Sequence, residues 1–162
     1  ATSDVILEDV RVHKDDILGR VGEGFTDAMK CLDVGRIGVA AQSLGVAQAC
    51  LDEAVKYAKE RKQFGKYLYE HQGIAFMIAD MATKVKAARE LVYDAAVTKD
   101  NGGNSTEICN EVAAKSLQIH GGYGFVRGFK IERLYRDCRV FTIYEGTSQI
   151  QQMVIAGQIV GK

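Results

Sequence analysis

No proline occurs anywhere in the 162 residues of this chain, and this absence constrains the fold more than any other feature. Proline breaks helices because it lacks a backbone N–H donor and its ring clashes with the preceding turn. An average chain would contain about 5% proline. Glycine supplies the interruptions instead, in clusters at 19–24, 102–103 and 121–128. The sequence therefore predicts long helices separated by glycine-containing turns.

Apolar residues recur at helical spacing along most of the chain. Residues 25–60 are expected to form one long helix or two, because Gly35, Gly38 and Gly45 weaken the first half. The predicted buried face there is Leu44, Ala47, Leu51, Ala54, Val55 and Ala58. A second helix has the predicted face Ile74, Met77, Ile78, Met81, Val85, Ala88, Leu91, Val92 and Ala95, and is expected to end at Asn101-Gly102-Gly103.

Three further helices complete the predicted fold. One begins near Asn104 or Ser105, a short charged one covers about 129–140, and the last runs from Ser148. The third helix is expected to bury Cys109, Val112, Ala113, Ser116 and Leu117. The fold class predicted for 24–162 is all-α, an antiparallel four-helix-type bundle.

The first 20 residues differ from the rest. Val5, Leu7, Val10 and Val12 alternate with polar neighbours, which predicts a short strand, and 14–16 is expected to be a turn. A lone strand cannot form a stable sheet. The chain also starts with Ala1 rather than Met, so we expect a fragment that begins with the end of another domain.

Composition argues against several classes of protein. The 21 basic residues balance the 21 acidic ones, so no nucleic-acid surface is expected. No apolar run is long enough to span a bilayer and no signal peptide opens the chain, so we expect neither membrane insertion nor secretion. The four cysteines and three histidines have no metal-site or disulfide spacing, which predicts reduced thiols and no metal.

The segment 144–151 places one carboxylate, on Glu145, immediately before a new helix. Ser148 and Gln151 have the spacing of a capping box, and the apolar run 153–156 is expected to be the buried part of that helix. A carboxylate held in such a frame is well placed to meet a substrate. The alternative is that Glu145 only complements the helix dipole.

Three other clusters also allow two interpretations each. Cations at 61–66 could complement a helix C-terminus or bind a phosphate group. Glycines within 118–124 could cap a helix or let a flat ligand approach the backbone. Arg36, next to Gly35, could form a surface ion pair or contact a ligand.

In this order, the motifs 61–65, 71–72, 118–122 and 144–149 closely resemble those of the acyl-CoA dehydrogenase family. The likeness covers the whole chain and corresponds to the family's carboxy-terminal helical domain at 24–162, with 1–23 as a remnant of the middle β-domain and linker. It implies FAD-dependent α,β-dehydrogenation of an acyl-CoA thioester, with Glu145 as the catalytic base that removes the α-proton.

The resemblance also implies binding roles. The residues matching FAD contacts are Arg61, Lys62, Gln63, His71, Gln72, Gln118, Ile119, His120, Gly121, Gly122, Thr147, Ser148 and Gln149. In the family, 118–122 lie against an FAD bound mainly by a neighbouring subunit. The residues matching acyl-CoA contacts are Asp33, Val34, Gly35, Arg36, Tyr144 and Gly146.

Two further features refine the resemblance. Isovaleryl-type and long-chain-type members carry the base at the position of Gly35, so Gly35 together with Glu145 indicates a short-chain, medium-chain or butyryl-type enzyme and a short acyl chain. Between Asn101 and Gln118 the chain is shorter than relatives by about eleven residues, close to three helical turns. The interpretations are a true deletion, engineering or an omitted segment.

The family also implies a homo-oligomer (dimer or tetramer), an electron-transfer flavoprotein as partner, and a bacterial cytoplasmic or mitochondrial-matrix location. The fragment itself is expected to be inactive. Two alternatives remain: an acyl-CoA oxidase-like flavoenzyme, and a non-catalytic helical oligomerisation module.

Overall fold

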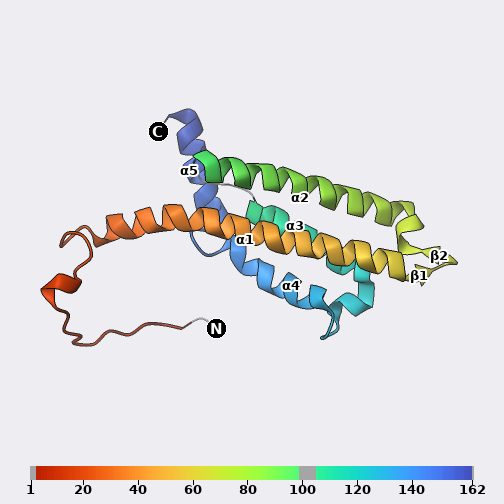
Figure 1. The fold of residues 1–162 in the computed structure, drawn as a ribbon, viewed down its shortest axis with the longest axis horizontal. Coiled ribbons are helices and arrows are strands. Elements are labelled where there is room, and N and C mark those ends of the chain that lie inside the picture. The colour runs from red at the N-terminus through yellow and green to blue at the C-terminus, as the bar shows by residue number, and fades with distance from the viewer. Residues whose placement is uncertain (1–2, 99–104, 162) are drawn as a thin grey trace.

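The computed structural model describes residues 3–98 and 105–161. Three long helices follow one another up and down: α1 (Gly24–Glu60), α2 (Gln72–Thr98) and α3 (Ser105–His120). Helix α4 (Lys130–Cys138) then runs back along the bundle, and α5 (Ser148–Val160) crosses its end (Figure 1). The all-α antiparallel bundle is confirmed, and 25–60 forms one helix rather than two. The expected stop at Asn101-Gly102-Gly103 lies outside the described residues.

Small side chains let α1 and α3 pack closely together. Ala47, Ala54 and Ala58 are fully buried on α1, one or two turns apart as their spacing predicts. Across the interface, the Ser116 hydroxyl on α3 donates a hydrogen bond of 2.7 Å to the backbone carbonyl of Cys50. Leu51 and Val55 lie at the half-buried margin of this face.

Helix α2 packs against both α1 and α3 through a regular buried face. Its members are Met81, Val85, Ala88, Val92 and Ala95, all from the predicted set. The prediction for Leu91 is wrong, because this side chain lies at the edge of the buried face and is 49% exposed. Ile74, Met77 and Ile78 pack against the core in half-buried positions.

Three cysteines, Cys50, Cys109 and Cys138, are buried together where α1, α3 and α4 meet, and all are free thiols. Burial raises the pKa of the Cys50 thiol to about 12. A hydrogen bond with Cys138, together with burial, also raises the pKa of Cys109. The same hydrogen bond lowers the pKa of Cys138. The thiols of Cys50 and Cys109 therefore stay protonated, and they fill the core as small apolar groups.

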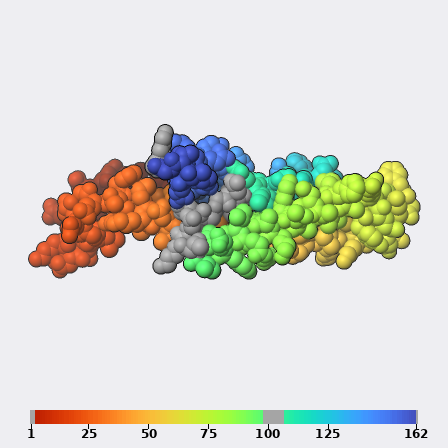
Figure 2. Space-filling model, turned by 90° about the horizontal axis from the view of Figure 1, so that it is seen from above, coloured from red at the N-terminus to blue at the C-terminus, as the bar shows by residue number. Residues whose placement is uncertain are grey.

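The expected strand at 5–12 is wrong. Residues 3–13 form no strand, and 14–16 is a 3₁₀ turn, η1 (Lys14–Asp16), rather than an open turn. Every described side chain up to Thr26 is exposed. A strand needs a hydrogen-bonded neighbour, and no segment among the described residues lies beside this one. Figure 2 shows this segment and the first turns of α1 extending beyond the rest of the molecule.

A hairpin that the helical pattern did not predict joins α1 to α2. Strands β1 (Lys62–Gln63) and β2 (Lys66–Tyr67) pair antiparallel around Phe64 and Gly65. Both turn residues have positive φ, 51° and 81°, as the two-residue turn of a tight hairpin requires. The short 3₁₀ turn η2 (Leu68–Glu70) then leads into α2.

The start of α5 differs from the predicted capping box by one residue. The N-cap is Thr147, whose hydroxyl accepts from the Ile150 backbone N–H at 3.5 Å. The Gln151 side chain instead donates to the Glu145 backbone carbonyl. The apolar run 153–156 is not buried, because no helix of the described chain packs over α5 as it crosses the bundle end.

None of the helices within the described ranges is both long and apolar enough to cross a membrane.

Candidate functional site

Glu145 sits at a turn between the 3₁₀ segment η4 (Arg139–Thr142) and α5, and its backbone is unusual. Its φ is 57°, and the following Gly146 has φ 93°. Glycine adopts positive φ freely, but a side chain there costs roughly 1–2 kcal/mol. Such strain persists where the surroundings hold it, and it is concentrated at functional sites.

Two side chains hold this turn by the same backbone atom. Arg36 Nε, from α1, and Gln151 Nε2, from α5, each donate to the Glu145 carbonyl oxygen at 3.2 Å. Arg36 is itself oriented by Asp33, whose carboxylate accepts from Arg36 Nη1 at 2.6 Å. Of the predicted substrate residues 33–36, Gly35 and Arg36 therefore do meet Glu145, although more than a hundred residues separate them in sequence.

The carboxylate of Glu145 lies against α1 without a hydrogen-bond partner for one oxygen. Its Oε2 is buried and accepts no hydrogen bond within the described structure. Gly35 provides the space: a Cβ there would come within 2.8 Å of Oε2. An unpaired buried oxygen is costly, so a group that binds here and supplies a proton or a donor would be favoured.

Tyr144 forms one wall beside the carboxylate. Its hydroxyl donates to Gln42 Oε1 at 2.9 Å, and its ring stacks on Phe141 with centroids 6.0 Å apart. Burial, and secondarily the negative charge of Glu145, raise the pKa of the Tyr144 hydroxyl. Tyr144 therefore stays neutral at physiological pH. Val34, in contrast, is 75% exposed on the outer face of α1.

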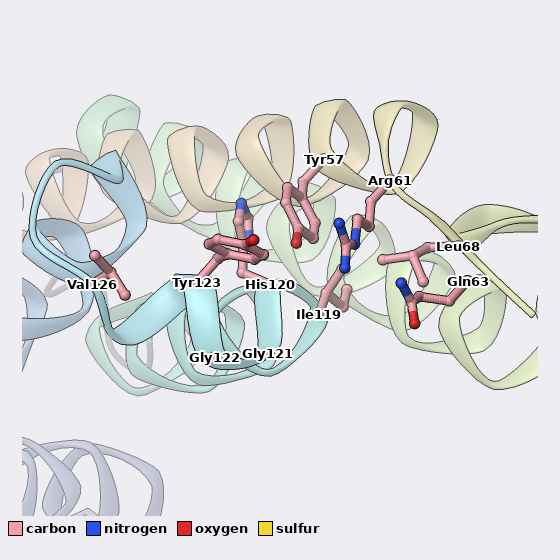
Figure 3. A pocket seen from close by; sticks show the side chains of 10 residues that line it. All are labelled: Tyr57, Arg61, Gln63, Leu68, Ile119, His120, Gly121, Gly122, Tyr123 and Val126. Carbon is pink, nitrogen blue, oxygen red and sulfur yellow. The ribbon is translucent and has the colours of Figure 1, made fainter.

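A second candidate region is a cavity of about 420 Å³ at the other end of α1 (Figure 3). It brings together two clusters that are far apart in sequence, one after α1 and one at the end of α3. Tyr57 and Arg61 descend from α1, whereas Ile119 and His120 belong to α3. The lining residues are Tyr57, Arg61, Gln63, Leu68, Ile119, His120, Gly121, Gly122, Tyr123 and Val126.

Aromatic contacts order this cavity. Arg61 lies over the Tyr123 ring, 5.5 Å from guanidinium carbon to centroid. His120 stacks on Tyr57 with centroids 4.3 Å apart, and its Nδ1 donates to the Ser116 carbonyl at 2.8 Å. Nδ1 therefore carries a proton, because a carbonyl oxygen only accepts.

The floor of the cavity is glycine. A Cβ added at Gly121 or Gly122 would meet nothing within 4 Å, so the backbone is open to a ligand. Gly121 also has φ 58°, within the 3₁₀ turn η3 (Gly121–Phe125). A cation, an amide and stacked rings beside bare backbone could hold an anionic group and a flat ring together.

Four of the predicted cofactor residues line neither this cavity nor the one at the start of α5. Lys62 is exposed and lies over the Tyr67 ring at 4.3 Å. His71 braces the hairpin through a 3.1 Å contact between its Nε2 and the Gln63 carbonyl. Gln72 and Gln118 are exposed.

The remaining predicted cofactor residues line another cavity, of about 310 Å³, at the start of α5. They are Thr147, Ser148 and Gln149, and the other lining residues are Glu107, Arg139, Thr142 and Ile143. Ser148 Oγ is buried without a partner. An unpaired hydroxyl, a cation, a carboxylate and a helix N-terminus form a polar lining suited to a hydroxylated ligand.

Sequence reasoning missed several residues of these sites: Gln42, Tyr57, Tyr123, Arg139 and Gln151. Tyr57 stands one turn before Arg61 on the same helix face, and Tyr123 lies inside the glycine segment. Both positions could have signalled a role. For Gln42, nothing local connects it to Tyr144.

The described residues contain no cluster of three or more histidine, cysteine, aspartate or glutamate side chains able to hold a metal ion.

Residues 22–160 match the sequence profile of the acyl-CoA dehydrogenase C-terminal domain. The chain belongs to the acyl-CoA dehydrogenase family. The resemblance drawn from the ordered motifs is thereby confirmed.

Individual relatives refine the comparison. The caffeyl-CoA reductase–Etf complex subunit CarC of Acetobacterium woodii is 63% identical, covering 100% of this chain and 46% of the relative. The 3-(aryl)acrylate reductase of Clostridium sporogenes is 55% identical over 98% of this chain and 45% of the relative. Butyryl-CoA dehydrogenase from Megasphaera elsdenii superposes with a TM-score of 0.90 at 42% identity, over 96% of this chain and 43% of that one.

The chain thus spans less than half the length of these relatives. The alignment with the Acetobacterium protein has 173 positions against the chain's 162 residues, a difference of eleven. This difference equals in size the shortening expected between Asn101 and Gln118.

Proposed function

We propose that this chain is the carboxy-terminal helical domain, residues 24–162, of an FAD-dependent enzyme that interconverts an acyl-CoA thioester and its α,β-unsaturated counterpart. Residues 1–23 would then be the remnant of the middle β-domain and linker. The observation that carries the proposal is the Glu145 carboxylate, held at a strained turn with one buried oxygen unpaired. A base needs such an oxygen, directed at substrate and not occupied by a donor.

The proton chemistry follows from Glu145. In dehydrogenation its carboxylate removes the α-proton of the thioester, while the β-hydrogen leaves as hydride and a carbon–carbon double bond forms. In the reverse direction the protonated carboxyl returns that proton to the α-carbon. The Glu145 backbone N–H is proposed to donate to the thioester carbonyl and stabilise the negative charge that develops there.

Arg36, Tyr144 and Gly146 are proposed to frame the thioester around this base. Arg36 keeps the turn in place through the Glu145 carbonyl, and Asp33 orients Arg36. Tyr144 is proposed to contribute a neutral wall and to help exclude water once substrate is bound. Excluding water matters because it strengthens every electrostatic contact made to the developing charge.

The residues that line the two cavities, one at the end of α1 and one at the start of α5, have the chemistry to hold FAD. Bare glycine backbone, Arg61 and Gln63 suit a pyrophosphate and its sugars, and the unpaired hydroxyl of Ser148 is free to contact a ligand. The FAD that contacts the start of α5, close to Glu145, would accept or return the β-hydride. His71 and Gln72 are proposed to support the hairpin that carries Gln63, and the exposed Lys62 and Gln118 are proposed to reach the cofactor from outside the cavity.

The two cofactor regions are proposed to contact two different FAD molecules. Arg36 lies on α1 and Arg61 directly follows the last residue of that helix, about 38 Å further along its axis at 1.5 Å per residue. One cofactor beside Glu145 would not also reach the cavity at the far end of α1. This supports a homo-oligomer in which 118–122 contact the FAD of a neighbouring subunit.

A second observation concerns direction and substrate. The two reductases named above are 63% and 55% identical to this chain, against 42% for the butyryl-CoA dehydrogenase. We therefore infer reduction of a 3-arylacrylyl thioester, rather than oxidation of the short straight acyl chain that Gly35 suggested. The name of the Acetobacterium relative includes an Etf complex, which supports an electron-transfer flavoprotein as electron donor.

The experiment is made on the full-length protein that contains this chain. Glu145→Gln should lower turnover by about 10² to 10⁴-fold, because the amide can neither take nor return the proton. The matched control is Glu90→Gln, whose side chain is exposed on α2 and which should leave turnover unchanged. Normal turnover in Glu145→Gln would favour the helical oligomerisation module instead.

The same protein preparation distinguishes between the alternative substrates and between the alternative electron acceptors. Turnover of cinnamoyl-CoA should exceed that of crotonyl-CoA, and equal or lower turnover would favour a short-chain enzyme. Release of hydrogen peroxide during oxidation of saturated thioesters would favour the oxidase-like alternative.

A further inference from the structure

The bare backbone of Gly35 lies directly under the Glu145 carboxylate. A Cβ at residue 35 would come 2.8 Å from Oε2, 3.2 Å from Cδ and 3.6 Å from Oε1. All three carboxyl atoms therefore rest on one residue of α1. A separation of 2.8 Å is shorter than any ordinary contact of a Cβ, so even a methyl group would displace the carboxylate.

The backbone of Glu145 has little freedom to move away from α1. The backbone of Glu145 is held from α1 by Arg36 and from α5 by Gln151. The carboxylate can therefore move only by rotation about the side-chain bonds of Glu145. The space above residue 35 is open to it only while that residue has no side chain.

We propose that Gly35 is a positioning residue that holds the Glu145 carboxylate in its proton-transfer position by having no side chain. The proposal rests on Glu145 being the base of the proposed function. It adds that the glycine has a role of its own, separate from any contact with substrate. With Gly35 present, Oε2 is buried yet unpaired, and no protein donor competes with the substrate hydrogen.

The chain offers a matched control on the same helix. Gly38 lies three residues further along α1, and a Cβ there would meet nothing within 4 Å. Glycine-to-alanine changes at both sites raise helix propensity alike. The two variants therefore differ in whether the new methyl group meets Glu145.

Gly35→Ala and Gly38→Ala are compared in the full-length, FAD-loaded enzyme. We expect Gly35→Ala to lower kcat by about 10- to 100-fold, with KM little changed, because a displacement of the order of 1 Å misplaces the base. Gly38→Ala should behave as the unmodified enzyme. Equal kcat in the two variants would overturn the proposal.

A second readout does not depend on flavin reduction. A thioester with sulfur at the β-position has no β-hydrogen to give up, but its α-hydrogens still exchange in D₂O when a base removes them. Exchange per bound flavin, followed by proton NMR, should fall in Gly35→Ala by the same factor as kcat. Unchanged exchange would overturn the proposal even if kcat had fallen.

A double variant tests the contact itself. Glu145→Asp withdraws the carboxylate by one methylene, so adding Gly35→Ala to it should cost little further exchange. Additive losses would count against the proposal. If Glu145→Gln abolishes exchange while Gly35→Ala matches Gly38→Ala, only the role of Gly35 fails. If Glu145→Gln exchanges normally, the proposed function fails.

Discussion

Arg36 on α1 donates a hydrogen bond to the backbone carbonyl of Glu145, 109 positions away in sequence, at 3.2 Å. The Arg36 side chain is only 14% exposed, and its Nη1 is occupied by Asp33 at 2.6 Å. One guanidinium thus uses two edges for two different elements. The planar fork is what makes this possible, since an ammonium group on a flexible stem cannot present two fixed donors in this geometry.

We expect Arg36→Lys in the full-length enzyme to lower kcat by about tenfold or more, which corresponds to losing a hydrogen bond from a charged donor worth about 1.5–3 kcal/mol. Charge is retained, so long-range electrostatics is largely unchanged. The measurement is steady-state kcat for the enoyl thioester. Arg136→Lys on α4, where an exposed arginine pairs with Glu132, should have no effect. Equal kcat in Arg36→Lys and the unmodified enzyme would rule out this role for the fork.

The end of α3 depends on Gly124, which is buried. A Cβ there would meet the Leu117 carbonyl oxygen at 2.7 Å and the Leu117 Cγ at 3.2 Å. Gly124→Ala should therefore lower the free energy of unfolding by about 1–3 kcal/mol, as overpacking does. Gly122→Ala, which meets nothing within 4 Å, should change it by less than about 0.5 kcal/mol. Thermal unfolding of the FAD-free protein measures both, and similar melting temperatures for the two variants would contradict the expectation.

An ion-pair network links α2 and α3 through Asp80, Lys84, Glu111 and Lys115. Hydrogen bonds that Lys115 and Lys84 donate lower the pKa of Asp80 and of Glu111, and the bonds that Lys115 donates to these two carboxylates raise its own pKa. The carboxylates therefore stabilise the fold above their ordinary pKa values near 4, and this contribution is lost as pH falls below them. The Lys115 contribution is lost only in strong alkali.

We expect Lys115→Met to lower the free energy of urea unfolding slightly at pH 7 and by less at pH 3, because protonation of the carboxylates weakens the network as pH falls toward their lowered pKa values. The effect is small because all four side chains are partly exposed and screened by solvent. High salt should shrink the pH 7 difference. An undiminished difference at pH 3 would show that Lys115 acts through packing of its stem.

The helix faces could be predicted from sequence because the residues of one face recur every three or four positions, whichever element packs against that face. Ala47, Ala54 and Ala58 are buried as their spacing requires. The prediction of a strand at 5–12 was wrong for the opposite reason. A strand is stable only when it pairs with another strand, and an alternation of apolar and polar residues does not provide that partner. The N-cap at Thr147 shifted by one residue because Gln151 is engaged by Glu145 rather than by the cap.

The candidate site could be named from sequence but not assembled from it. Glu145 stood out through its local frame, whereas its contact with Gly35 depends on how α1 passes the final turn. Tyr57 and Tyr123 line one cavity only because the ends of α1 and α3 meet there. Such long-range meetings are set by packing, and no local pattern carries them.

Helix α1 runs unbroken from Gly24 to Glu60 and carries Gly35 and Arg36 toward one end and Tyr57 toward the other. The two regions are therefore fixed in rotational phase about a common axis. Inserting one residue between them would turn one region by about 100° relative to the other, because each residue of an α-helix advances by that angle. The stretch between them should thus tolerate substitution far better than a change in length, for instance at Gly38 and Gly45, where an added Cβ would meet nothing within 4 Å.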